Sequence, residues 1–262
     1  MSGLPDVLAR IVARRRERLG VAAGTVVLET AAPDPGRFDL AHPFLGALAA
    51  RRGRAVIAEV KMGSPRLGSL HGRVDPLAQA KSYAAHGAAA LSVVVEPDFF
   101  HGDWELLAAC REVSGLPAIA KDFVVSPAQL DAASAAGAAA ILLVAALYTP
   151  AELARLAAAA RRRGLVPLVE THTPEEVAKL AGAEWELVGV NNRDLRTFEV
   201  DLARSLALAP ALPAGALRVA ESGIRSAAEV ARLAAGGFDA FLIGESLLLA
   251  SDPGALLAEL AG

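Results

Sequence analysis

Cysteine is almost absent from this chain, which has a single one, Cys110, among 262 residues, so no internal disulfide can form. Cys110 lies in WELLAACREV, an amphipathic pattern that predicts a helix and an inert, half-buried thiol. No run of about 20 apolar residues occurs, and membrane-spanning helices need one. The first twenty residues carry charges throughout and lack the apolar core of a signal peptide. We therefore expect a soluble, cytoplasmic protein with no membrane contact.

An excess of positive charge is also missing, since the formal net charge is −3. This gives no electrostatic case for binding nucleic acid or an anionic membrane, and we expect neither as a partner. The one cationic cluster, Arg161–Arg163, ends a helical pattern, and we expect it to be a solvated helix end that complements the helix dipole.

Patterns typical of metal or cofactor sites are absent as well. The five histidines show no paired metal-ligand spacing, and no glycine-rich nucleotide fingerprint is present. The one combination that could supply a loop site, Asp98, His101 and Asp103, is disfavoured. We expect neither a metal nor an organic cofactor.

What the chain does contain is a regular alternation of short β-rich apolar runs with Ala/Leu/Arg-rich helical segments. The helical segments begin at cap residues, several followed by proline, namely Asp75, Ser126, Thr149, Thr173, Asp201, Ser226 and Asp252. Continuous rather than alternating apolar strands indicate a parallel sheet buried on both faces. Eight such units predict an α/β fold of the (β/α)8 TIM barrel class, with a doubly wound open sheet as the alternative. The predicted strands are 55–60, 90–95, 117–123, 139–145, 166–171, 186–192, 217–222 and 240–245.

Residues 1–52 precede the first predicted strand and form an N-terminal helical extension within a single domain, 1–262. Apolar spacing predicts helices near 4–19 and 42–52, joined by the proline- and glycine-containing AAPDPGRF. Such an extension either plugs the bottom of the barrel or covers its active mouth.

Charged side chains gather at the carboxyl ends of the predicted strands, where barrel enzymes place their reacting groups. In AVIAEVKMGSPRLG, Glu59 and Lys61 are two residues apart and point to the same side of the strand. Lys121, Glu170 and Glu221 occupy equivalent positions on later strands. Two lysines and three glutamates around one mouth would be partly desolvated, which proteins tolerate mainly for paired or functional groups. Such a set can supply both an acid and a base.

Glycines follow the last two strands, in Ser222-Gly223-Ile224-Arg225 and Gly244-Glu245-Ser246. Backbone N–H groups can approach an anion there, and barrels usually bind phosphate at this place. The Glu245 carboxylate is expected to turn away while its backbone amide faces the ligand. The alternative is that these glycines only make tight turns.

Seven segments appear in an order that resembles indole-3-glycerol-phosphate synthase along the whole chain: AVIAEVKMGSP, LSVVVEPDFFHGD, AIAKDFVVSPAQL, PLVETHT, GVNNRDLRTFEVD, VAESGI and FLIGESLL. The resemblance implies a (β/α)8 barrel with extra N-terminal helices that acts in tryptophan biosynthesis. It implies a carboxy-lyase that closes the ring of 1-(2-carboxyphenylamino)-1-deoxyribulose 5-phosphate, with loss of CO2 and water and without cofactor. It also implies a monomer or weak homodimer.

The resemblance further implies roles for individual residues. Lys121 resembles the general acid, and Lys61 resembles the lysine that holds the substrate carboxylate. Glu59 and Glu170 look like the carboxylates that handle protons. The remaining matches are Asn191 and Glu221 for ordering the network, Ser64, Phe100, Phe123, Leu142, Arg193 and Leu195 for substrate binding, and Ser222, Gly223, Gly244 and Glu245 for phosphate.

The chain departs from the family pattern at a few positions. Met62 follows Lys61 where the family usually has a basic residue, and the next loop reads Ser64-Pro65-Arg66-Leu67-Gly68 instead of Ser-Pro-Ser-Lys-Gly. Strand 90–95 ends in valines where the family typically has a threonine. Three alternatives remain: phosphoribosylanthranilate isomerase, a Schiff-base aldolase, and a non-catalytic paralogue that binds a sugar phosphate or a partner subunit.

Overall fold

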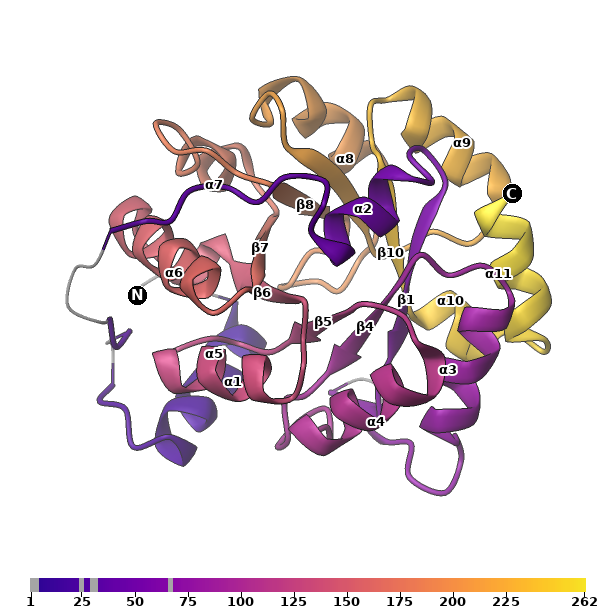
Figure 1. The fold of residues 1–262 in the computed structure, drawn as a ribbon, viewed down its shortest axis with the longest axis horizontal. Coiled ribbons are helices and arrows are strands. Elements are labelled where there is room, and N and C mark those ends of the chain that lie inside the picture. The colour runs from indigo at the N-terminus through magenta and orange to yellow at the C-terminus, as the bar shows by residue number, and fades with distance from the viewer. Residues whose placement is uncertain (1–4, 24–25, 29–32, 66–67) are drawn as a thin grey trace.

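Eight parallel strands close into a barrel in a computed structural model that describes residues 5–23, 26–28, 33–65 and 68–262 (Figure 1). Sequential strands are neighbours, and the first pairs with the last, so the predicted (β/α)8 barrel is confirmed. The strands are β1 (Ala55–Val60), β4 (Ala90–Val94), β5 (Ala118–Lys121), β6 (Ala140–Val144), β7 (Val166–Thr171), β8 (Leu187–Asn191), β9 (Leu217–Glu221) and β10 (Ala240–Ile243).

Helices follow the strands and surround the barrel, as the apolar spacing predicts. They are α3 (Pro76–Ala85), α4 (Trp104–Ser114), α5 (Pro127–Ala135), α6 (Pro150–Arg162), α7 (Pro174–Ala178), α8 (Ala203–Leu208), α9 (Ala227–Ala235), α10 (Glu245–Leu249) and α11 (Pro253–Ala261), with 3-10 turns η1 (Ala145–Leu147) and η2 (Ala209–Ala211). A short hairpin of β2 (Gly63–Ser64) and β3 (Gly68–Ser69) after β1 was not predicted; Arg66 and Leu67 lie outside the described residues.

Most of the predicted cap residues begin the helices by accepting backbone hydrogen bonds. Thr149 and Ser226 each form a capping box with the glutamate three residues later. Asp201 lies one residue before the N-cap of α8, yet its side chain still accepts the N–H of Ala203. Local sequence therefore sets where these helices start.

The N-terminal extension covers both ends of the barrel. Its first helix, α1 (Asp6–Arg18), contributes residues to the cavity at the carboxyl ends of the strands. Its second helix, α2 (Pro43–Ala49), buries Phe44, Leu45 and Leu48 and contacts β1 and β4. His42, the N-cap of α2, lies 3.2 Å from the Gly164 carbonyl just before β7, so α2 lies at the amino end of the strands. In Figure 1 α2 lies across the strands.

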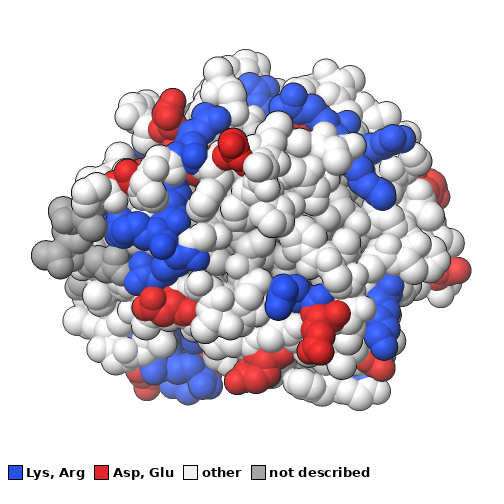
Figure 2. Space-filling view, viewed as in Figure 1, with Lys and Arg blue, Asp and Glu red and all other residues white. Residues whose placement is uncertain are grey.

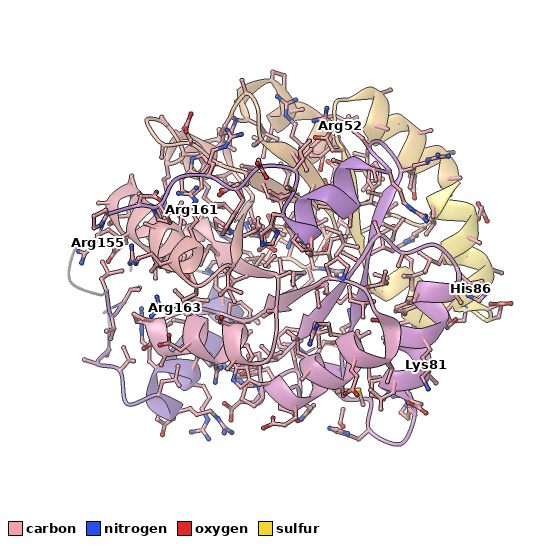
Figure 3. The ribbon with its side chains drawn as sticks, in the orientation of Figure 1. Arg52, Lys81, His86, Arg155, Arg161 and Arg163 are labelled. Carbon is pink, nitrogen blue, oxygen red and sulfur yellow. The ribbon has the colours of Figure 1, made fainter. Side chains whose placement is uncertain are left out.

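Arg161, expected as a solvated helix end, is instead buried, so that prediction was wrong. Its guanidinium donates to both Glu186 carboxylate oxygens at 2.8 Å and to Asp34 at 2.6 Å. The segment 33–38 lies over the end of α6, where Asp34 accepts from Arg161 and the Pro33 carbonyl accepts from Arg162. Figure 3 shows Arg161 between α6 and this segment, with Arg155 at the outer edge. Figure 2 shows charged side chains mainly around the rim of this face.

Cys110 is fully buried in α4, and burial raises the pKa of its thiol to about 12. This agrees with an inert thiol, although the side chain is more buried than predicted. No helix in the described part of the chain has both the length and the apolar character to cross a membrane.

Candidate active site

A cavity of about 200 Å³ opens where the strands end. Every site residue predicted from sequence lines it except Glu221, which lies buried behind the lining. The predicted residues that line the cavity are Glu59, Lys61, Ser64, Phe100, Lys121, Phe123, Leu142, Glu170, Asn191, Arg193, Leu195, Ser222, Gly223, Gly244 and Glu245. The structure therefore brings together side chains that are up to about 190 positions apart in the chain.

Two lysines share one carboxylate at the centre of this cavity. Glu59 Oε1 accepts from Lys61 Nζ at 2.7 Å, and Glu59 Oε2 lies 3.3 Å from Lys121 Nζ. Lys121 Nζ also lies 3.6 Å from Glu221 Oε2. The strand alternation that predicts Glu59 and Lys61 on one side is confirmed by their direct contact.

The two lysines hold Glu59 ionised. Burial alone would raise the pKa of Glu59, but the charges of Lys61 and Lys121 outweigh burial and bring the pKa to about 2. Burial alone would lower the pKa of Lys121, whereas Glu59, Glu221 and Glu170 raise it well above its ordinary value. At neutral pH the site therefore contains a carboxylate at Glu59 and an ammonium group at Lys121.

Glu221 is ionised with difficulty. Burial raises the pKa of its carboxyl group well above the usual range, the charge of Glu170 raises it further, and Lys121 only partly opposes them. Neither oxygen has a hydrogen-bond partner among the residues the structure describes. The direction of this shift favours the protonated form of Glu221 beside Glu170, an arrangement that suits proton transfer.

Two glycines make room for these carboxylates. A Cβ atom on Gly244 would overlap the Glu59 carboxylate, and a Cβ atom on Gly189, within β8, would overlap Oε1 of Glu221. Neither glycine has a positive φ angle, so the missing side chain, rather than the backbone conformation, is what matters here. Each carboxylate occupies the space that a glycine leaves empty, Gly189 within β8 and Gly244 directly after β10.

Arg193 links the end of β8 to the loop after β10. Its Nη2 donates to Glu245 Oε2 at 3.0 Å and its Nη1 donates to the Phe198 carbonyl at 3.2 Å. Its backbone N–H donates to the side chain of Asn191. The Glu245 carboxylate is therefore engaged by a guanidinium group.

The loop after β9 has an uncommon backbone. Ser222 has φ = +67° and Gly223 has φ = +83°, the left-handed region that residues with a side chain rarely adopt. A Cβ atom on Gly223 would overlap Val200, so this position needs glycine for space as well. Non-glycine residues with such φ angles persist only where surrounding contacts hold them.

Asn192 supplies those contacts, and no sequence pattern predicts this role. Its Nδ2 donates to the carbonyl oxygens of Glu221 at 3.0 Å and Ser222 at 3.2 Å. Its Oδ1 accepts from both the N–H and the hydroxyl of Ser205, at 3.1 and 2.7 Å. Asn192 is fully buried and positions the residues that turn from β9 into the loop.

One wall of the cavity is apolar. Phe100 and Phe123 lie with their ring centroids 6.3 Å apart, and Leu142 and Leu195 complete the wall that was predicted. Val7, Leu8 and Ile11 of α1 also line the cavity. The helical pattern of residues 4–19 predicts an apolar face on α1, but it does not say which end of the barrel that face covers.

Metal ligands do not gather at this site or elsewhere in the described residues, where no three His, Cys, Asp or Glu side chains are arranged to hold an ion. The ammonium and carboxyl groups beside the apolar wall can transfer protons.

The fold and the cavity define a (β/α)8-barrel enzyme with an acid–base site at the carboxyl ends of its strands. Residues 8–260 match the family model described as indole-3-glycerol phosphate synthase. The indole-3-glycerol phosphate synthases of Acidithiobacillus ferrooxidans and Burkholderia vietnamiensis are each 40% identical to this chain over 98% of its length and 99% of their own. The corresponding protein of Koribacter versatilis is 45% identical over 81% of this chain and 82% of its own length. This chain belongs to the indole-3-glycerol phosphate synthase family.

Proposed function

We propose that this chain converts 1-(2-carboxyphenylamino)-1-deoxyribulose 5-phosphate into indole-3-glycerol phosphate, CO2 and water, a step of tryptophan biosynthesis. The observation that carries the proposal is the cluster of Glu59, Lys61, Lys121, Glu170 and Glu221 around one cavity with an apolar wall. Ring closure needs an acid at the ribulose carbonyl and an apolar surface for the aromatic ring.

Lys121 is the general acid for ring closure. Its ammonium group donates a proton to the ribulose carbonyl oxygen while the ring carbon that bears the carboxylate attacks the carbonyl carbon. Lys61, paired with Glu59 at the cavity wall, holds the substrate carboxylate. The bond to that carboxylate then breaks, CO2 leaves, and the electron pair restores the aromatic ring.

Glu170 and Glu59 handle the protons of the later steps, with Glu221 and Asn191 ordering the network. A carboxyl group protonates the hydroxyl that leaves as water, and a carboxylate removes the proton whose loss completes the pyrrole ring. The raised pKa of Glu221, due to burial and Glu170, supports a proton being stored beside Glu170 at neutral pH.

The substrate phosphate binds between the loops that follow β9 and β10, at Ser222, Gly223, Gly244 and Glu245. The Ser222 N–H already donates to the Leu242 carbonyl at 3.4 Å, so Ser222 contributes its hydroxyl. The pairing of Arg193 with the Glu245 carboxylate keeps that negative charge occupied. Phe100, Phe123, Leu142 and Leu195 surround the aromatic ring, and Ser64 contacts the substrate from the loop after β1.

A Schiff-base aldolase on the same fold needs a neutral lysine amine. Burial lowers the pKa of Lys121, but the acidic side chains around it, Glu59 foremost, raise it well above its ordinary value, which supports acid catalysis instead. Borohydride reduces a Schiff base to a stable covalent adduct. Because we expect no Schiff base in this protein, incubation with substrate and borohydride should leave the protein mass unchanged.

The test of this proposal is to incubate purified protein with the carboxyphenylamino-deoxyribulose phosphate and to follow the appearance of indole fluorescence. Turnover to indole-3-glycerol phosphate supports the proposal, and no turnover of this substrate contradicts it. Lys61→Met should raise KM as well as lower kcat, and an unchanged KM would remove the carboxylate-holding role. We also expect a cytoplasmic monomer or weak homodimer, which fractionation and sedimentation would test.

A further inference from the structure

His172 lies directly after β7, behind Glu170 as seen from the cavity. Its Nε2 atom is 3.4 Å from Oε1 of Glu170, and its side chain is only 6% exposed. Residues two apart at the end of a strand point to the same side, which explains the contact. His172 is not among the described residues that line the cavity, so it reaches a bound substrate only through Glu170.

The other ring nitrogen is held by Glu176, in the first turn of α7. Nδ1 lies 3.2 Å from Glu176 Oε2, which also accepts the backbone N–H of His172 at 2.7 Å. An ionised carboxylate only accepts hydrogen bonds, so Nδ1 carries a hydrogen atom. The proton that comes and goes on this ring is therefore at Nε2, the atom that faces Glu170.

Nε2 has no hydrogen-bond partner among the residues the structure describes, although it is buried. A buried polar atom without a partner is costly, and native structures rarely keep one without a reason. With Nε2 unprotonated, its lone pair faces the lone pairs of Glu170. With Nε2 protonated, the N–H and a small rotation of Glu170 make a charge-assisted hydrogen bond.

We propose that His172 is a positioning residue for Glu170, which it holds by an ion pair when Nε2 is protonated and releases when Nε2 is neutral. The inference rests on the proposed function, in which Glu170 transfers protons. The site then includes two residues behind the cavity wall: Glu176 orients His172, and His172 orients Glu170.

The charged groups placed against His172 are Glu170 on β7, Glu176 on α7 and Arg204 on α8. Burial lowers the pKa of His172, but Glu176 and Glu170 outweigh burial and raise it above the ordinary value of 6.5. Arg204, whose Nη1 donates to the His172 carbonyl at 3.4 Å, opposes them by its charge. The protonated form therefore persists to higher pH than for a free histidine, and kcat should fall as pH rises through this pKa.

Two substitutions separate the two ring nitrogens. The amide of His172→Asn can replace Nδ1 at Glu176 but does not reach Glu170, and we expect kcat to fall by about tenfold to a hundredfold with KM nearly unchanged. His172→Gln can place an uncharged N–H near Glu170, so it should keep more activity than His172→Asn. Both variants should lose the fall of kcat with rising pH.

Glu176→Gln changes the environment of His172 without changing the ring. It removes the strongest of the groups that raise the pKa of His172, so both the ring titration and the fall in kcat should move to lower pH. Glu175→Gln is the matched control, because it removes the same charge from the adjacent, exposed position and should move neither.

Proton–nitrogen NMR of protein labelled at its five histidines measures the ring titration directly, with His172→Asn assigning the signal. A His172 pKa above that of free histidine, lowered by Glu176→Gln, supports the inference. A His172 pKa at or below that of free histidine overturns it, as do superimposable kcat–pH profiles of wild type and His172→Gln. Absence of turnover in the wild type would instead overturn the proposed function, while the NMR titration would still decide the protonation of His172.

Discussion

The barrel contains a buried ion network at each end, and the two networks differ in how fully their polar atoms are paired. At the amino end, Glu186 Oε1 accepts from Arg161 and from the N–H of Phe38, and Glu186 Oε2 accepts from Arg161 again. Arg161 also donates to Asp34 and to the Glu184 carbonyl. Both Glu186 oxygens therefore have partners within the chain itself.

At the carboxyl end the pairing around Glu221 is incomplete, although Asp122, directly after β5, is fully paired with Arg15 and Gln129. Glu221 is just as buried as Glu186, yet neither of its oxygens has a hydrogen-bond partner in the described part of the chain, and Lys121 approaches only to 3.6 Å. His172 Nε2 is likewise buried without a hydrogen-bond partner in the described part of the chain.

The difference in pairing distinguishes a network that stabilises the fold from one that serves catalysis. A fully paired buried network fixes one arrangement of the chain, since every alternative loses hydrogen bonds. An incompletely paired network costs stability and leaves protons free to move or substrate groups free to bind, which is what a catalytic site needs. In the described residues, both Glu221 oxygens and His172 Nε2 are buried atoms without a partner at the reacting end, while the others belong to Gln79, Tyr83 and Ser92, which do not line the cavity.

The largest expected effect is at the incomplete network. Lys121→Met should lower kcat by about a thousandfold or more, because it removes the proton donor while the phosphate loops stay intact. Steady-state kinetics measures the loss, and calorimetry with a phosphorylated product analogue should show binding within about threefold of wild type. Lys81→Met on the exposed face of α3 is the control and should change neither (Figure 3). Near-normal turnover of the Lys121 variant would contradict the general-acid assignment.

Next in size is the fully paired network. Glu186→Gln leaves the buried guanidinium of Arg161 with only the half-exposed carboxylate of Asp34, and breaking a buried pair costs about 3–5 kcal/mol of unfolding free energy. Urea denaturation checks the loss, and kcat of the folded fraction should be unchanged. A loss below about 1 kcal/mol, the value of a surface ion pair, would show that the network is not structural.

Asn192→Ala should act on substrate binding more than on chemistry. Without its side chain the left-handed backbone at Ser222 loses its support, and we expect KM to rise by about tenfold while kcat changes little. Ser205→Ala is the matched control, since it removes one partner of Asn192 but leaves the bonds to the Glu221 and Ser222 carbonyls. An equal rise in KM for both variants would mean that general loosening, and not the loop, is responsible.

The smallest expected effect is a change in stability in Glu221→Gln, and it is a gain where the preceding substitutions cause losses. Because burial and Glu170 raise the pKa of folded Glu221, the folded state keeps a proton that the unfolded chain releases at neutral pH. Stability is therefore lost as pH rises from the unfolded to the folded pKa of Glu221, and an amide at this position abolishes that loss. Urea denaturation at about pH 5 and about pH 8 should show Glu221→Gln more stable than wild type only at the higher pH. Activity should fall, and a variant less stable at both values would contradict the comparison.

Much of the barrel could be predicted because its signals are local. Apolar runs mark the eight strands, Thr149 and Ser226 cap helices through contacts within one turn, and alternation places Glu59 beside Lys61. The rule that strand ends converge then brings Lys121 and Glu170 to the same cavity.

The rest depends on contacts between distant segments. Arg161 ends a helix like any solvated arginine until residues 33–38 cover it. Asn192 and His172 act through the atoms they contact on other elements, and nothing in NN or THT distinguishes them. The sequence left two positions open for the N-terminal extension, and the structure shows both. Helix α1 lies at the mouth of the barrel and helix α2 lies at its base.

The glycines beside the carboxylates set a condition for any attempt to move this chemistry to another barrel. Grafting Glu59 and Glu221 onto a host would fail wherever the adjacent strands carry side chains, because the methyl group of an alanine already fills the space. A design must therefore transfer each glutamate together with the glycine that makes room for it: Gly244 with Glu59, and Gly189 with Glu221.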